Sequence, residues 1–381
     1  MAVSKKIFFI SLSLFAISLL LWGVYNLSFK SRQPASEKAN QSSSSSNIPS
    51  PEINSPKISV VSSQPVLAPA LSSDGNKIRY FSKDTGQAFQ IDLDGENKEI
   101  LLLEETAGLS GVSWSYDFSK ALLKKTNIQG KINFSLYDFS EKKFTRLNEN
   151  VDEIAWQTNA NRIFYKYFDP KSRIGTLNVS DPDGKNWKKL TDISYRYISI
   201  SQIPKTGLIS FWNSGWAYNE TLFQSIPVVG GEIKTLLRGK FGADYLWNNS
   251  GNRVLVSHSD SNGGHKMQLA VMNNNGGEYK NLEIPTFISK CVWSENNKTV
   301  YYALPGGIPG NSILPNDYKS AKFNTTDTFW KINLETGEKS RLLELGDITG
   351  KFDADQMFLN QDESLLFFVD RIDKKLYQIS F

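Results

Sequence analysis

Polar and apolar positions alternate along most of the chain, and turn-forming residues interrupt this alternation at short intervals. Seven related segments show the pattern most clearly. Each has an anchor residue, then a polar turn, then an apolar run rich in β-branched and aromatic residues, as in VWSENNKTVYYAL. This order predicts a strand, a tight turn and a second strand. The seven anchors are Leu71, Trp114, Trp156, Ser201, Trp247, Trp293 and Phe358.

The anchors recur at spacings of 43, 42, 45, 46, 46 and 65 residues. Within each unit a second alternating segment follows, as in LNVSDPDGKNWKKLT and LAVMNNNGGEYKNL, and it predicts a further pair of strands. Four strands in about 45 residues is the period of a β-propeller blade. The sequence therefore predicts an all-β, seven-bladed β-propeller, built of four-stranded antiparallel blades, over residues 57–381.

The last unit reaches Phe381 before its fourth strand. A separate β-rich run, KISVV at residues 57–61, precedes the first anchor. We expect this run to become the outer strand of the last blade and to close the ring, because closure removes exposed sheet edges that would otherwise aggregate.

The cluster Asp181, Asp183 and Gly184 raises the question of a metal-binding loop. It occupies the place where other units have DLDGEN, NNNGGE or LETGEK, between the third and fourth strands. Asp, Asn and Gly suit hairpin turns, which need positive φ or side-chain bonds to the backbone. The calcium-loop pattern is not met, because no Glu stands at its twelfth position. We interpret the cluster as a turn.

The anchors, together with DPDGKNWKKLT, resemble the PD40 (WD40-like) repeats of the TolB propeller and of propeller domains in relatives of prolyl oligopeptidase. The resemblance covers residues 57–381. It implies a propeller that binds proteins or peptides, sometimes beside a hydrolase. The chain departs from the hydrolase members, because nothing follows the seventh blade to form a catalytic domain. It departs from TolB in lacking an obvious separate N-terminal domain.

An apolar segment without charges covers residues 7–27, after Lys5 and Lys6. Its 21 residues span roughly 31 Å as a helix, which is about the thickness of a bilayer core. We expect an uncleaved transmembrane helix; a cleaved signal peptide is the rival interpretation. Trp22 and Tyr25 suit a membrane interface.

A Ser- and Pro-rich segment follows, and residues 28–56 are expected to form a flexible linker. We expect residues 1–6 to be cytoplasmic and the protein to sit in the cell membrane as a single-pass protein. The propeller then lies on the extracytoplasmic side and is monomeric.

Composition excludes several classes of function. The formal net charge of +4 and the absence of a basic stripe argue against nucleic acid as a partner. The single cysteine, Cys291, excludes an intramolecular disulfide, and its apolar surroundings suggest a buried side chain. No nucleophile elbow, phosphate loop or C-x-x-C motif occurs, so we name no catalytic residue and expect no cofactor. Two histidines are too few for a multi-histidine catalytic metal centre.

The loops between the second and third strands are expected to be longest in blades four, five and six, and all emerge on one face. The sixth contains LPGGIPGNSILPNDYKSAKFNTTDT, which explains the spacing of 65 residues. Aromatic and arginine side chains are typical of binding hot spots. The residues that this face is expected to offer for binding are Tyr195, Arg196, Tyr197, Trp212, Trp216, Tyr218, His258, His265 and Tyr318.

Alternatives remain open for this face. Trp212 and Trp216 can equally fold inward and fill the core of their own hairpin. His258 and His265, with Asp260, either approach one metal ion or lie in a solvated loop; we interpret the segment as a solvated loop. The long insertion either has a defined role or is a flexible loop without one.

Two functions from different classes fit these features. The first is a membrane-anchored binding or scaffold propeller that recognises a protein, a peptide or an envelope glycan. The second is a propeller hydrolase or lyase that acts on glycans or lactones through carboxylates at the channel mouth. Acids with strongly raised pKa at one end of the channel would favour the second. A spacer without a specific ligand is a third possibility, since fold alone does not decide function.

Overall fold

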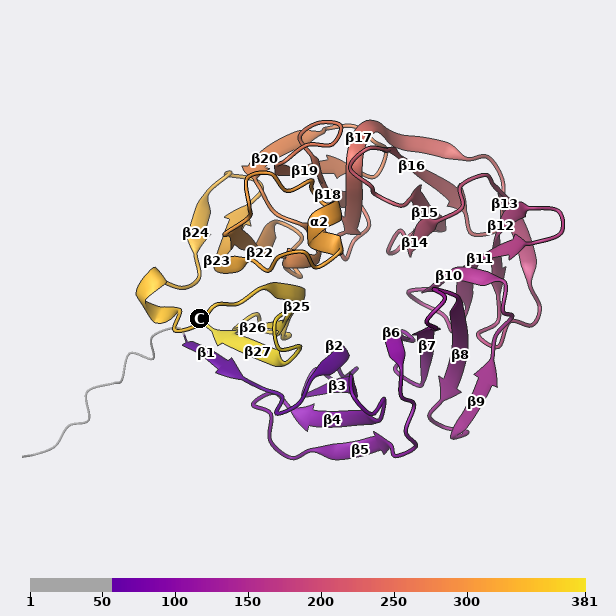
Figure 1. The fold of residues 1–381 in the computed structure, drawn as a ribbon, viewed down its shortest axis with the longest axis horizontal. Coiled ribbons are helices and arrows are strands. Elements are labelled where there is room, and N and C mark those ends of the chain that lie inside the picture. The colour runs from indigo at the N-terminus through magenta and orange to yellow at the C-terminus, as the bar shows by residue number, and fades with distance from the viewer. Residues whose placement is uncertain (1–56) are drawn as a thin grey trace, which may run out of the picture. The chain divides into compact units, whose positions relative to one another are not determined.

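The computed structural model describes residues 57–381, and these form antiparallel four-stranded blades arranged in a ring (Figure 1). The expected transmembrane helix (7–27) and linker (28–56) lie outside the described residues. Within residues 57–381, no helix is long and apolar enough to cross a membrane. Residues 57–381 belong to one compact unit.

The first four blades follow the expected order, with the first strand of each nearest the centre of the ring (Figure 1). Their strands are β2 (Val66–Leu71), β3 (Lys77–Ser82), β4 (Ala88–Asp92) and β5 (Glu99–Leu102) in blade one; β6 (Leu109–Trp114), β7 (Lys120–Thr126), β8 (Ile132–Asp138) and β9 (Lys143–Arg146) in blade two; β10 (Val151–Trp156), β11 (Ile163–Asp169), β12 (Ile174–Ser180) and β13 (Lys188–Ile193) in blade three; and β14 (Ile198–Gln202), β15 (Leu208–Asn213), β16 (Glu220–Pro227) and β17 (Lys234–Trp247) in blade four.

The remaining blades continue the same arrangement. Blade five adds β18 (Arg253–Ser259), β19 (Met267–Asn273) and β20 (Lys280–Ile284); blade six has the short helix η1 (Ile288–Lys290), β21 (Cys291–Trp293), β22 (Thr299–Gly306), α2 (Asn316–Lys319), β23 (Thr326–Asn333) and β24 (Lys339–Arg341); and blade seven has η2 (Leu345–Asp347), β25 (Ala354–Leu359), β26 (Leu365–Asp370), β27 (Leu376–Ser380) and, at its outer edge, β1 (Lys57–Val60).

Strand β17 serves two blades at once. Its first half pairs with β16 as the outer strand of blade four, and its second half pairs with β18 as the inner strand of blade five. Phe241 takes part in both pairings, opposite Glu220 and Ser259. Blades four and five therefore form one seven-stranded sheet.

The expected closure of the ring is confirmed. Strand β1 pairs antiparallel with β27, with Lys57 opposite Ser380 and Val60 opposite Tyr377. The Val61 amide then donates to the carbonyl of Leu376 at 2.8 Å. Blade seven thus has three strands from the end of the chain and one from its first described residues.

The repeated tryptophans join each blade to the one before it. Trp114 Nε1 donates to the Ala68 carbonyl at 2.8 Å, and Trp156 Nε1 donates to the Ser113 carbonyl at 3.0 Å. Trp293 Nε1 likewise donates to the Leu246 carbonyl at 3.1 Å. An indole fills the space between two sheets while its N–H finds a partner, which explains why this residue recurs at the anchor position.

The turn interpretation of the acidic cluster is confirmed. The Gly184 amide donates to the Asp181 carbonyl at 2.9 Å, and the Asp181 amide donates to the Lys185 carbonyl at 3.0 Å. Gly184 has a φ of +82°, which glycine adopts at little cost. Asn186 Nδ2 donates to Asp181 Oδ2 at 2.7 Å, so the Asp181 carboxylate supports the turn itself.

Candidate functional site

The loops between the second and third strands of blades four, five and six lie against one another. The Gly263 amide of blade five donates to the Ala217 carbonyl of blade four at 2.9 Å. The Leu314 amide of the insertion donates to the Gly264 carbonyl at 3.0 Å, and the Ala217 amide donates to Asn316 Oδ1 at 2.8 Å. Three loops that are distant in sequence therefore form one continuous surface.

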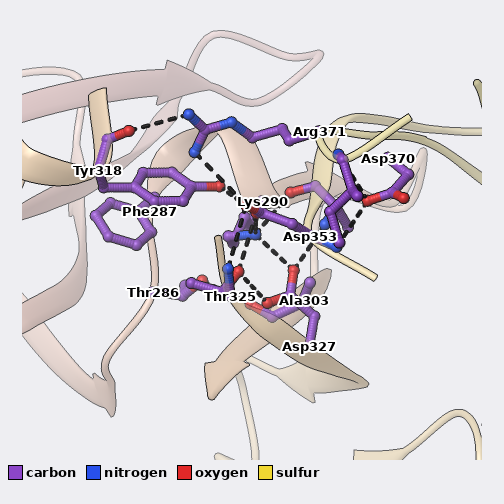
Figure 2. Close-up of polar contacts among 12 residues, drawn as sticks. Thr286, Phe287, Lys290, Ala303, Tyr318, Thr325, Asp327, Asp353, Asp370 and Arg371 are labelled. Carbon is purple, nitrogen blue, oxygen red and sulfur yellow. Dashed lines mark hydrogen bonds and ion pairs between the residues drawn. The ribbon is translucent and has the colours of Figure 1, made fainter. Parts of the chain in front are cut away.

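The insertion is held in place by a buried ionic cluster between blades six and seven (Figure 2). Lys290 Nζ, which has no solvent-exposed surface, donates to Asp327 Oδ2 at 2.5 Å and to Asp353 Oδ1 at 2.7 Å. The Tyr318 hydroxyl donates to the same Asp353 oxygen at 2.6 Å. Burial raises the pKa of Asp327, and the charge of Lys290 opposes this change.

The ring of Tyr318 is also enclosed on both sides. Phe287 stacks on it with ring centroids 4.1 Å apart, and the Arg371 guanidinium lies 3.8 Å from its centroid. Arg371 also donates to the Tyr318 carbonyl at 3.0 Å. These contacts attach the insertion to blades six and seven, so α2 is a packed part of the face rather than a flexible loop.

Four of the expected binding residues lie exposed on this face. They are Tyr195, Tyr197, Trp216 and Tyr218, of which Tyr197 retains 59% and Trp216 47% of its surface. Arg196 lies beside them, with its guanidinium 4.2 Å from the ring centroid of Phe168. His265 is exposed, and its Nδ1 lies 2.8 Å from the carbonyl of Ser312 in the insertion.

Three expected residues prove to be buried, which corrects their assignment to the exposed face. Trp212 packs edge-on against Phe223 and Tyr245 in the core of blades four and five, because its strand position points inward. His258 is buried on β18, where Nε2 lies 2.7 Å from the Tyr279 hydroxyl. Tyr318 is buried between Phe287 and Arg371, and its hydroxyl donates a hydrogen bond to Asp353 of the ionic cluster.

Two of these exposed aromatic residues, Tyr197 and Trp216, line a hollow of about 350 Å³ between blades two, three and four. We call this the blade 2–4 hollow. Its lining comes from β7 and β8 of blade two, β10 of blade three, and β14 and the 214–219 loop of blade four. The lining residues are Lys124, Ile132, Asp152, Glu153, Tyr197, Ile198, Ser199, Ser214 and Trp216.

Two consecutive acids enter the hollow because β10 is bulged. Val151 pairs with Tyr167 and Glu153 pairs with Lys166, so Asp152 is the extra residue between two paired positions. A bulge of this kind re-aims side chains at the start of a strand. Sequence reasoning missed this pair; the only signal was the sequence VDEIAW, with two adjacent acids ahead of an anchor.

The two acids have different electrostatic surroundings. Asp152 forms an ion pair with buried Lys166, at 2.6 Å between Nζ and Oδ2, and a second with Arg196. Glu153 lies 4.0 Å from Lys124 Nζ. Burial, with the neighbouring charge of Asp152, raises the pKa of Glu153 to about 7 although Lys124 opposes the shift. The hollow thus holds one carboxyl group in ion pairs with two cations and one whose pKa is raised to about 7.

A metal site is not evident on this face. Within residues 57–381, no three His, Cys, Asp or Glu side chains are grouped so that they could hold a metal ion. His258 and His265 do not converge, since one is buried against Tyr279 and the other faces Ser312. Cys291 is a buried free thiol, as expected from its sequence.

Comparison with known proteins identifies the fold. No protein-family model matches the chain, and no curated protein sequence matches it either. Among solved structures, oligogalacturonate lyase from Vibrio parahaemolyticus aligns with a TM-score of 0.58 and 9% identity, over 83% of this chain and 89% of that chain. An oligogalacturonate lyase in complex with manganese aligns with a TM-score of 0.59 and 11% identity, over 86% and 90%.

The propeller domain of the Trilobed protease from Pyrococcus furiosus aligns with a TM-score of 0.53 and 10% identity, over 82% of this chain and 94% of that chain. That domain is described as having an open velcro topology, whereas β1 closes the ring here. TolB from Acinetobacter baumannii, at a TM-score of 0.41, is too dissimilar to support an argument. These likenesses establish an all-β propeller and leave its activity open.

Proposed function

We propose that the chain is a membrane-anchored, extracytoplasmic β-propeller that binds a glycan in the blade 2–4 hollow. The observation that carries this proposal is the arrangement of exposed Trp216 and Tyr197 beside Asp152, Glu153 and Lys124 in one hollow. Flat aromatic rings stack on the C–H faces of sugars, while carboxylate and ammonium groups bond to hydroxyls. A hollow of about 350 Å³ suits one or two sugar units better than a broad protein surface.

The charges of the hollow favour a glycan that carries acidic groups. Lys124, Asp152 and Glu153 line the hollow. Lys166 and Arg196 lie outside the lining and form ion pairs with Asp152, so three positive charges stand against two carboxyl groups. Protonation of Glu153 near pH 7 makes this balance more positive. The fold likeness to oligogalacturonate lyase, whose name specifies an acidic glycan, is consistent with this direction and adds no residue-level support.

The binding proposal is tested with an array of acidic and neutral glycans, probed with the full-length chain in detergent. Trp216→Ala is expected to weaken binding about 30-fold, since truncating a hot-spot aromatic residue costs about 2 kcal/mol. Trp187→Ala is the matched control, because Trp187 is exposed and lies outside the hollow. An equal loss of glycan affinity in both variants, or no loss of affinity in either variant, contradicts the proposal.

A second candidate function is cleavage of the bound glycan, and the raised pKa of Glu153 favours it. A general acid or base works best with a pKa near the working pH, and Glu153 meets that condition. Asp152, which its ion pairs with Lys166 and Arg196 hold in place, contributes to the raised pKa of Glu153.

Cleavage is tested by incubating each glycan that binds and analysing the products by mass spectrometry. Glu153→Gln is expected to abolish turnover while binding persists, because glutamine keeps the shape of the side chain and cannot transfer a proton. If the unmodified chain leaves every bound glycan intact, the cleavage function is contradicted and the binding function remains.

A further inference from the structure

A groove lies between blades one and two, and none of its lining residues belongs to the blade 2–4 hollow. Its volume is about 780 Å³. One wall is the link at residues 104–108, which joins β5 to β6, and the other wall comes from β7, β8 and β9. Lys124 lines the hollow and the next residue, Lys125, lines the groove, because side chains alternate between the two faces of a strand.

Strand pairing gathers four polar residues of blade two on the face that meets blade one. Lys125 on β7 pairs with Asn133 on β8. Ser135 on β8 pairs with Arg146 on β9. Paired residues share a face of the sheet, as do residues two apart on one strand, so these four form one polar row. Leu123, which also pairs with Ser135, packs in the core shared with blade one and thereby identifies the face.

The third strands of two other blades carry apolar residues on the corresponding face. Strand β4 presents Phe89 and Ile91 to the core that blade one shares with blade seven. Strand β23 presents Trp330 and Ile332 to the core that blade six shares with blade five. The polar row of blade two therefore accompanies an open groove, whereas apolar rows accompany packed interfaces.

The four charged residues of the lining are divided between the two walls. Lys125 and Arg146 belong to blade two, while Glu104 and Glu105 belong to the link from blade one. None of the four takes part in an ion pair with another residue of 57–381. Glu149 lies beyond the lining and is engaged in an ion pair of its own. One wall is therefore positive and the other negative, and neither is neutralised by a bound partner within the chain.

The polar groups of the groove are accessible to a ligand. Glu104, Glu105 and Arg146 are exposed, and Lys125 is half-buried. Between the charged groups, Asn133 Nδ2 and the Ser135 hydroxyl form no hydrogen bond with any described residue, and neither atom is closed off from solvent. Oδ1 of Asn133 is buried, so only Nδ2 of this amide can meet a ligand.

We propose that this groove binds a small zwitterion, in which a carboxylate and an ammonium group are separated by a short chain. The carboxylate faces Lys125 and Arg146, and the ammonium group faces Glu104 and Glu105. A ligand with a single charge satisfies one wall and meets the opposite wall without a counterpart. The volume lies within the range of about 300–1,000 Å³ that small-molecule sites span. This site is independent of the proposed glycan function.

The test compares three probes that differ only in their charged ends. The zwitterion is 6-aminohexanoate; 6-aminohexanamide keeps only the ammonium group, and 6-acetamidohexanoate keeps only the carboxylate. Binding to the full-length chain in detergent is titrated by saturation-transfer NMR. We expect the zwitterion to bind saturably and each analogue to bind about fivefold more weakly, because a solvent-accessible ion pair makes a modest contribution.

Two double variants test the walls separately. Lys125→Met with Arg146→Met should abolish the preference for the zwitterion over 6-aminohexanamide, because the carboxylate loses its partners. Glu104→Gln with Glu105→Gln should abolish the preference for the zwitterion over 6-acetamidohexanoate, because the ammonium group loses its partners.

The matched control is Lys143→Met with Arg173→Met, which removes two exposed cations outside the lining and changes the net charge by the same amount as the first variant. It should keep both preferences. The proposal fails if the zwitterion does not bind saturably, if the unmodified chain binds the three probes equally, if either groove variant keeps its preference, or if the control variant loses one.

Discussion

Replacing Lys290 by methionine should destabilise the propeller strongly. Its ammonium group lies within 2.5 and 2.7 Å of two carboxylates and 2.8 Å from the Ala354 carbonyl, and all three groups are buried. Methionine keeps most of the side-chain volume and removes the charge. Asp327 and Asp353 would then be left without their shared cation in a site that water does not reach.

The size of this effect follows from the cost of an uncompensated buried charge. Removing one partner of a buried ion pair costs about 3–5 kcal/mol. Unfolding entropy of about 2.1 cal/mol/K per residue, over roughly 325 described residues, amounts to about 0.7 kcal/mol/K. The melting temperature should therefore fall by about 4–7 °C, as measured by calorimetry on the full-length chain at pH 7.

A second substitution distinguishes this reasoning from a simple loss of packing. Adding Asp327→Asn to Lys290→Met removes one negative charge and restores the net charge of the cluster. The double variant should recover part of the lost stability, because the remaining carboxylate, Asp353, still accepts hydrogen bonds from Tyr318 and Thr325. A melting temperature that is unchanged in the single variant, or that falls further in the double variant, refutes the argument.

Three further predictions concern closure, an anchor and a titrating group. Deleting residues 57–61 should lower the melting temperature by several degrees, because blade seven loses its outer strand. Deleting residues 40–44 is the control and should leave the melting temperature unchanged. Equal melting curves for the two deletions would contradict the role of β1. Trp156→Phe should cost about 1 kcal/mol in urea unfolding, since the Ser113 carbonyl loses its donor, and a midpoint equal to that of the unmodified chain would count against the inter-blade hydrogen bond. The pKa of Glu153 rises from its ordinary 4.5 to about 7 on folding, so its contribution to stability is full below pH 4.5 and is lost as pH rises towards 7. Glu153→Gln should remove this loss, which is measured as the pH dependence of the urea midpoint between pH 4.5 and 8, and parallel curves for the two proteins would contradict the shift.

The face of the propeller was only partly predictable. The sequence located the long loops of blades four to six and the exposed aromatic residues Tyr197 and Trp216. It did not reveal that Asp152 and Glu153 share a hollow with Lys124, because these residues come from different blades. The bulge that turns both acids into the hollow leaves no mark in the alternation of polar and apolar positions.

What the sequence by itself determined is the architecture of residues 57–381. Strand alternation, turn residues and the repeated Trp anchor are local signals, so they predicted the blades, the hairpin turn at Asp181–Gly184 and the closure by β1. The tertiary structure alone decided that Trp212 faces the core and that Tyr318 enters an ionic cluster with Lys290. The physical reason is that a side chain's partners across blades depend on how two sheets pack and where a strand is bulged. Neither property is encoded within the few residues around that side chain.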